Sequence, residues 1–255
     1  MGGRNEKQLY QNVIVMRHGP RLDNFNTKWP ETADRPWNPP LYDGAEYKNL
    51  YSDTAKKIRE EVGAPIHRVI VSPFLRCLQT ASRTIEALSS QQLLSSSTAA
   101  AAAHFSPPQI KVSVEYGLAE MMNQKAIWVP PQDGDFKFVL AECQDHLPSK
   151  TLCDNTIYEK LPKWGETKDT ARDRYNHVVR TLADKYPCEN LLLVTHAEGV
   201  VALSHIFMNG ARVRADYCGY VHLRRPIKDG VSSFFSGPII DLMLHGQSGI
   251  TLREK

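Results

Sequence analysis

The chain has 255 residues, of which 42% are hydrophobic and 23% are charged, and its formal net charge is +3. This size and composition fit one large soluble domain that can bury a full core without disulfides. The small positive excess suits an anionic substrate, but it is too weak to indicate direct binding to nucleic acid or to a membrane surface.

The cysteines and the absence of long apolar stretches indicate the cellular compartment in which the protein is expected. Five scattered cysteines in no paired short spacing indicate neither a disulfide framework nor a zinc site. Residues 1–11 are polar, and no stretch approaches the roughly 20 apolar residues that a membrane helix needs. We therefore expect a cytoplasmic protein, with the nucleus as the alternative, and no membrane partner; the sequence predicts no oligomeric state.

Four short apolar segments are typical of buried strands, and each ends at polar residues: 12–16, 69–71, 110–114 and 191–194. Between and after them lie helical patterns over residues 45–62, 75–88, 167–185 and 199–208. This alternation predicts an α/β fold, a three-layer α/β/α sandwich with a mainly parallel central sheet.

Three stretches interrupt the pattern. Residues 89–106 are rich in serine and alanine, which favours a flexible insertion in a single domain over residues 1–255; alternatively, the alanines extend the preceding helix. Residues 29–42 and 123–162 are candidates for a cap over a site. In the second, Trp128, Phe136 and Phe138 either line a substrate wall or, as we favour, form the core of the cap.

Basic residues follow three of the predicted strands. Arg17-His18-Gly19 comes directly after the first, Arg76 lies in the first helical turn after the second, and His196 follows the last. Ligands bind outside the carboxyl ends of strands in such sheets, and arginine and histidine suit phosphate chemistry. Taken singly, each has an ordinary explanation: a solvated turn, a surface arginine behind a Ser72 helix cap, and a structural histidine.

Together these strings resemble the histidine phosphatase superfamily, which includes phosphoglycerate mutases and many phosphatases. The resemblance covers Arg-His-Gly at 17–19, Ser-Pro-x-x-Arg-x-x-Gln-Thr-Ala at 72–81 and Thr-His at 195–196, in a region from about residue 13 to 208. It implies a phosphoglycerate mutase-like fold, with His18 as the residue that becomes phosphohistidine and with no metal or other cofactor. It also implies that the phosphoryl oxygens are bound by Arg17, Arg76 and His196.

Two glutamates follow the strand predicted over 110–114. Glu115 and Glu120 resemble the Glu-x-Gly-Leu-x-Glu pattern of the phosphatase-type members, which implies that Glu120 is the general acid. We expect a bound phosphate and a protein wall to raise its pKa toward working pH. Glu115 is the alternative acid, and a solvated pair without a catalytic role is the ordinary explanation.

The string Arg17-His18-Gly19-Pro20-Arg21 is similar to the tyrosine phosphatases of the ubiquitin-associated and SH3 domain-containing type and to steroid phosphate phosphatases. This resemblance implies Arg21 as a further phosphate ligand, whereas the mutase pattern Glu-Arg-x-Tyr-Gly is absent at residues 114–118. Pro20 and Ala197 depart from the usual residues of the branch. Neither residue removes a group that the chemistry needs, so we interpret both as changes that adjust the activity without abolishing it.

The sequence therefore predicts a phosphomonoester hydrolase that acts on an aromatic or bulky organic phosphate, including phosphotyrosine, as a small molecule or a phosphopeptide. Two alternatives stand beside it. One is a catalytically weak or inactive phosphate-binding scaffold in a larger complex, and the other is a mutase.

Overall fold

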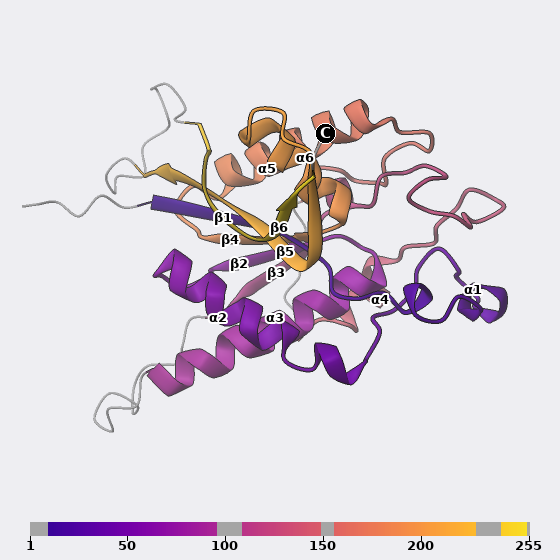
Figure 1. Ribbon diagram of the computed structural model, residues 1–255, viewed down its shortest axis with the longest axis horizontal. Helices are drawn as coiled ribbons and strands as arrows, with labels where there is room; N and C mark the ends of the chain where they lie inside the picture. Colours follow the sequence, from indigo (N-terminus) through magenta and orange to yellow (C-terminus); the bar gives the residue numbers. More distant parts are fainter. Residues whose placement is uncertain (1–9, 96–108, 149–155, 228–240, 254–255) are drawn as a thin grey trace, which may run out of the picture.

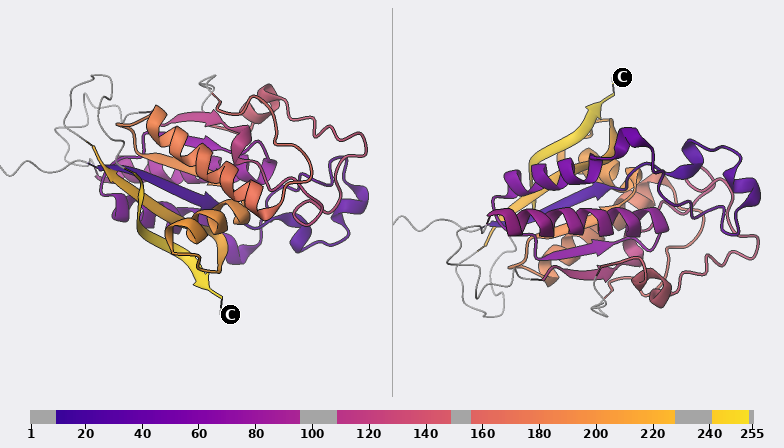
Figure 2. Two further views of the ribbon diagram at one scale, coloured as in Figure 1. Left: turned by 90° about the horizontal axis from the view of Figure 1, so that it is seen from above. Right: turned by 90° about the horizontal axis from the view of Figure 1, so that it is seen from below.

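The chain was analysed as a computed structural model that describes residues 10–95, 109–148, 156–227 and 241–253. Six strands form one sheet, in the order β3-β2-β4-β1-β5-β6, between two layers of helices (Figures 1 and 2). The predicted three-layer α/β fold with a mainly parallel sheet is confirmed.

The four parallel strands are the apolar segments predicted from the sequence: β1 (Tyr10–Arg17), β2 (Arg68–Val71), β3 (Lys111–Val114) and β4 (Leu191–Thr195). Their short, mostly β-branched or leucine-rich segments are buried on both faces. Arg17 pairs with Thr195, and Val71 pairs with both Val114 and Val194. The residues that follow these strands therefore meet at one edge of the sheet.

Two antiparallel strands extend the sheet beyond β1. Strand β5 (Val213–Pro226) pairs with β1, and β6 (Met243–Leu252) pairs with β5. The β5–β6 register breaks between Ala215 and Tyr220, and Cys218 within this bulge has a positive φ of 55°. The bulge places its residues beside the end of β1.

Helices α2 (Leu50–Val62) and α3 (Leu75–Ser95) cover one face of the sheet, and α5 (Lys168–Lys185) and α6 (Ala197–Phe207) cover the other (Figure 2). Alternate residues of β1 enter the two cores: Ile14 and Met16 pack on the α2 and α3 side, and Val13 and Val15 on the α5 and α6 side. A side-chain capping box at Thr167 and Thr170 begins α5.

Short helices lie in the connecting segments: η1 (Leu22–Asn24), α1 (Trp29–Thr32), η2 (Ala45–Tyr47), η3 (Tyr116–Leu118) and α4 (Leu140–Gln144). Figure 1 shows α1 and α4 beyond the carboxyl ends of the parallel strands. Phe136 and Phe138 join the core on the α3 side, as favoured, but Trp128 is 63% exposed. The prediction that Trp128 belongs to the core is wrong, because its segment crosses the surface.

Helix α3 continues to Ser95, so it includes the first residues of the predicted insertion. Most of that insertion, residues 96–106, lies outside the described part of the chain. None of the described helices has both the length and the apolar composition needed to span a bilayer.

Candidate active site

The imidazole of His18 lies just past the end of β1 and is 2% exposed. Its backbone N–H donates to the carbonyl of Thr195 (2.9 Å), which extends the pairing of β1 with β4. Its Nδ1 lies 2.6 Å from the carbonyl oxygen of Gly19, and Nε of Arg76 lies 3.2 Å from its Nε2. A carbonyl only accepts and a guanidinium only donates, so Nδ1 carries the proton and the lone pair of Nε2 accepts from Nε of Arg76.

Burial and the positive charges of Arg76 and Arg17 hold the pKa of His18 well below 6.5. The ring is therefore neutral at neutral pH. A neutral imidazole whose tautomer is set by a backbone carbonyl is suited to act as a nucleophile through Nε2.

His196 lies at the N-cap position of α6 and is fully buried. Its Nδ1 lies 3.1 Å from Oε2 of Glu120, and Oγ of Ser72 lies 2.8 Å from its Nε2. The carboxylate of Glu120 only accepts and favours a proton on Nδ1, whereas Nη2 of Arg76, 3.0 Å from the same nitrogen, only donates and favours a lone pair there; the hydroxyl of Ser72 can donate or accept. Burial lowers the pKa of His196 to about 4. Ser72 therefore orients His196, while the first amide of α3, at Leu75, donates to the side chain of Asn38 (2.8 Å).

Glu120 is 6% exposed, and its Oε2 also accepts from Nη2 of Arg76 (3.2 Å). Burial opposes ionisation of this carboxyl, but its contacts with His196 and Arg76 outweigh burial and hold its pKa well below the usual range. The rise in pKa expected from the sequence applies to the complex with a phosphate; the protein's own contacts act in the opposite direction, because Arg76 and His196 face the carboxylate.

Glu115 has a different environment. It is the N-cap residue of η3, and its carboxylate accepts from the backbone amides of Gly117 (2.8 Å), Ile157 (2.6 Å) and Tyr158 (3.0 Å). Burial raises its pKa. Of the two glutamates, only Glu120 contacts the histidines and Arg76 directly, whereas Glu115 joins two backbone segments.

Arg17 and Arg21, on either side of His18 in the sequence, have different hydrogen-bond partners. Nη1 of Arg17 donates to the carbonyl of Ala215 in the β5 bulge (2.7 Å), and its guanidinium lies 4.3 Å from the ring centre of Tyr217. Arg21 makes two bonds to the buried carboxylate of Asp23, one of them 2.6 Å between Nε and Oδ1. The structure therefore brings Arg17, His18, Arg76, Glu120 and His196 together. Arg21 is paired with Asp23, but its charge still contributes to lowering the pKa values of Arg17, Arg76 and His196.

The loop around Pro20 is joined to the neighbouring segment. The carbonyl of Pro20 accepts from the amide of Tyr42 (2.8 Å), and Arg21 forms a β-bridge with Leu41. Proline leaves its carbonyl free to accept, so these contacts are compatible with Pro20. Ala197 begins α6 directly after His196.

The sequence matches no protein-family model and no curated protein. Solved structures are similar in fold. An ecdysone phosphate phosphatase from Bombyx mori, in complex with tungstate, has a TM-score of 0.58 and 17% identity, over 91% of this chain and 98% of that one. A phosphoglycerate mutase from Bacillus anthracis has a TM-score of 0.52 and 12% identity, over 89% and 95%. The fold is phosphoglycerate mutase-like.

Arg76 lies at the centre of the side-chain cluster in this phosphoglycerate mutase-like fold. Ligand-type atoms of His18, Glu120 and His196 lie within 4.8 Å of one another, a grouping that could hold a metal ion. However, the guanidinium of Arg76 lies within 3.2 Å of one such atom in each residue. A divalent cation there would face a buried positive charge at short range. His18, Glu120 and His196 are therefore arranged to bind the guanidinium of Arg76 rather than a metal ion.

Two buried donors of the arginines beside His18 lack acceptors in the described part of this phosphoglycerate mutase-like fold. They are Nε of Arg17 and Nη1 of Arg76. Buried donors are normally satisfied, and an unsatisfied one costs about 1–3 kcal/mol, more when it is charged. Both belong to cations beside the lone pair of His18. The arrangement therefore suits an anion with several acceptor oxygens.

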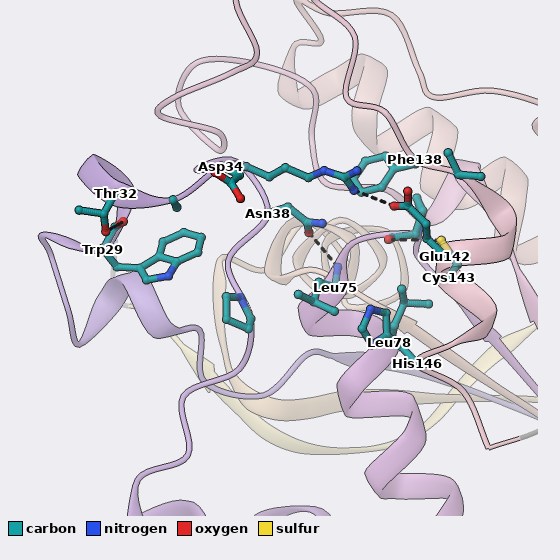
Figure 3. A pocket seen from close by; sticks show the side chains of 15 residues that line it. Trp29, Thr32, Asp34, Asn38, Leu75, Leu78, Phe138, Glu142, Cys143 and His146 are labelled. Atoms are coloured by element: carbon teal, nitrogen blue, oxygen red, sulfur yellow. Dashed lines mark hydrogen bonds and ion pairs between the residues drawn. The ribbon is translucent and has the colours of Figure 1, made fainter.

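A separate cavity of about 600 Å³ lies between α1 and α4 (Figure 3). Asn38 and Leu75, joined by the bond that caps α3, contribute to its wall, and Arg35 pairs with Glu142 (2.8 Å) among its lining residues. None of the clustered side chains lines this cavity. It therefore adjoins the start of α3 without containing the site.

Proposed function

We propose that this protein is a histidine phosphatase that hydrolyses phosphomonoesters through a phosphohistidine at His18. One observation carries the proposal: Nε2 of His18, whose lone pair accepts from Nε of Arg76, lies beside buried donors of Arg17 and Arg76 that have no acceptor in the described part of the chain. Phosphoryl oxygens would satisfy these donors, and the charge that develops on them in transfer would be stabilised.

In the first step, Nε2 of His18 forms a bond to phosphorus while the bond from phosphorus to the ester oxygen breaks. The departing oxygen takes a proton from Glu120. Glu120 must first gain that proton. A bound phosphate monoester that takes Arg76 as its partner removes part of the attraction that keeps the carboxyl ionised, and its own negative charge raises the pKa of Glu120.

In the second step, water attacks phosphorus and transfers a proton to Glu120, and the bond to Nε2 breaks. Inorganic phosphate and the neutral His18 are the products. His196, held in place by Ser72, supports both steps when its Nδ1 donates to Glu120 or to a phosphoryl oxygen. From a Glu120 that has taken one proton from solvent, each turnover conserves atoms and protons, because Glu120 gives this proton to the departing oxygen and regains one from the attacking water.

The substrate we propose has an aromatic or bulky leaving group, with phosphotyrosine as one example, in agreement with the resemblance to the tyrosine phosphatase branch. Two exposed or half-exposed aromatic side chains support this choice. The ring of Tyr217 lies 6.4 Å from that of His18 and 4.3 Å from the guanidinium of Arg17, and the exposed Trp128 lies 6.0 Å from the guanidinium of Arg21. Planar groups stack on such surfaces.

A phosphate-binding scaffold is the second candidate, and one observation favours it. Arg21, an expected phosphate ligand, is neutralised by Asp23, which leaves fewer unpaired cations for the transition state.

The deciding experiment measures phosphate release from p-nitrophenyl phosphate between about pH 5 and 8, where histidine titrates, without added metal. It compares the wild type with His18→Ala and with His177→Ala, an exposed histidine on α5. Turnover that persists in His177→Ala and vanishes in His18→Ala supports the enzyme. Tight phosphate binding without turnover in the wild type supports the scaffold.

A further inference from the structure

The loop from Gly117 to Met122, which includes Glu120, is held by an unusual number of side chains. The carbonyl of Leu118 accepts from the hydroxyl of Thr195 (2.7 Å), and that of Ala119 accepts from the hydroxyl of Tyr175 (2.7 Å). Each donor is buried. The backbone around Glu120 is therefore tied to β4 and to α5.

Arg174 of α5 makes the largest contribution to this arrangement. Its Nη1 donates to the carbonyls of Gly117 (2.6 Å) and Ala119 (3.1 Å), and its Nη2 lies 3.4 Å from the carbonyl of Glu120. One guanidinium therefore contacts three carbonyls within four residues, and its five donors leave Nε and Nη2 able to bind a carboxylate as well, which the three donors of an ammonium do not allow.

Glu166 completes the arrangement from the other side. Its two carboxylate oxygens accept from Nε and Nη2 of Arg174, both at 2.7 Å, and one of them also accepts from the amide of Met122 (2.9 Å). The side chains of Arg174 and Glu166 are 4% and 9% exposed. A bidentate buried pair holds both partners in one geometry. It therefore restrains the loop on both sides of Glu120.

We infer that Arg174 is a positioning residue for Glu120. Its guanidinium, oriented by Glu166, keeps the loop where the Glu120 carboxylate reaches Arg76 and His196. The inference rests on the proposed function only in assigning proton transfer to Glu120. The side chains of Arg174 and Glu120 do not contact each other, but the inference couples their positions. A change at Arg174 should move the Glu120 carboxylate away from His196.

The kinetic test uses leaving groups with different needs for a proton. An alkyl phosphate requires protonation of its departing oxygen, whereas p-nitrophenyl phosphate hardly does. For Arg174→Met we expect kcat on an alkyl phosphate to fall about 10- to 100-fold, as for misplacement of a catalytic group by about 1 Å, and kcat on p-nitrophenyl phosphate to fall less than about threefold. Arg174→Lys should recover part of the alkyl phosphate turnover.

Arg172→Met is the matched control, because Arg172 lies two residues away on α5 and pairs with the exposed Asp169. It should leave both rates unchanged. Equal losses on both substrates in Arg174→Met, with His18-dependent turnover intact in the wild type, would overturn the inference while the proposed function stands.

A second measurement does not depend on turnover. The ¹⁵N chemical shifts of the His196 ring report on the carboxylate 3.1 Å from its Nδ1. In Arg174→Lys and Arg174→Met these shifts should move in the same direction as in Glu120→Gln, and they should be unchanged in Arg172→Met. Unchanged His196 shifts in a folded Arg174→Lys protein would contradict the inference even if the wild type hydrolyses no phosphate.

Discussion

Replacement of Glu115 by alanine should cost stability rather than chemistry. The Glu115 carboxylate accepts from three backbone amides, at 2.6, 2.8 and 3.0 Å, and the residue is 1% exposed. Each amide left without a partner costs about 1–3 kcal/mol. Ile157 and Tyr158 are only partly buried, so their amides can regain water, and burial already disfavours the carboxylate. The lower end of the range, about 3 kcal/mol in total, is therefore expected.

For a chain of this size that loss corresponds to a decrease in Tm of about 6–12 °C. Thermal and urea unfolding of Glu115→Ala measure it, with Glu159→Ala, at an exposed site on the same segment, as a control that should change stability by less than about 0.5 kcal/mol. Well below its Tm, Glu115→Ala should keep the wild-type ratio of rates on alkyl and p-nitrophenyl phosphates. An unchanged Tm, or a selective loss on the alkyl phosphate, would refute the structural role.

Two further predictions concern pH and the loop after His18. The pKa of His196 is about 4 in the fold and about 6.5 in the unfolded chain, so the unfolded state binds more protons between these values; the contribution of His196 to stability is complete above about pH 6.5 and should be about 2 kcal/mol lower at pH 5. Urea unfolding at pH 7.5 and 5 tests this, and an equal pH dependence in His196→Gln would contradict it. A Cβ at Gly19 would lie 2.4 Å from the hydroxyl oxygen of Tyr51, so Gly19→Ala should destabilise by about 1–3 kcal/mol. Tyr51→Phe should restore part of that stability in the double variant, and no restoration would mean that the clash is relieved elsewhere.

The four parallel strands, β1 to β4, could be predicted because each is a continuous apolar segment between helices. Strand β6 lacks that pattern: its residues alternate between half-buried and exposed, and it contains two glycines. Strand β5 is interrupted by its bulge. An outer strand with one exposed face is specified by its pairing with a neighbour, which local sequence does not reveal. Strands β5 and β6 could therefore be identified only from the three-dimensional structure.

The same distinction applies to the site. His18, Arg76 and His196 could be brought together from the sequence because each follows a predicted strand of one parallel sheet. Tyr217 could not, because it lies in the β5 bulge. Arg174 could not either: on a helix full of charged residues it resembles a solvated side chain, and its burial depends on Glu166, in a segment without regular structure.

The pairing of Asp23 with Arg21 shows a further limit. The resemblance implied that Arg21 binds the phosphate, but whether its charge is paired depends on a carboxylate two residues away that contacts it. A phosphate-binding role for Arg21 could be predicted from the sequence. Whether its charge is paired with a carboxylate could be seen only in the three-dimensional structure.

The position of β1 in the sheet has a consequence for protein synthesis. This strand leads directly into the proposed nucleophile, yet its neighbours on either side are β4 and β5, made some 180 to 200 residues later. The amide of His18 pairs with the carbonyl of Thr195, and Arg17 with that of Ala215. Pairings of such long sequence separation form slowly. The candidate site therefore cannot assemble before residue 215 has been synthesised and has left the ribosome.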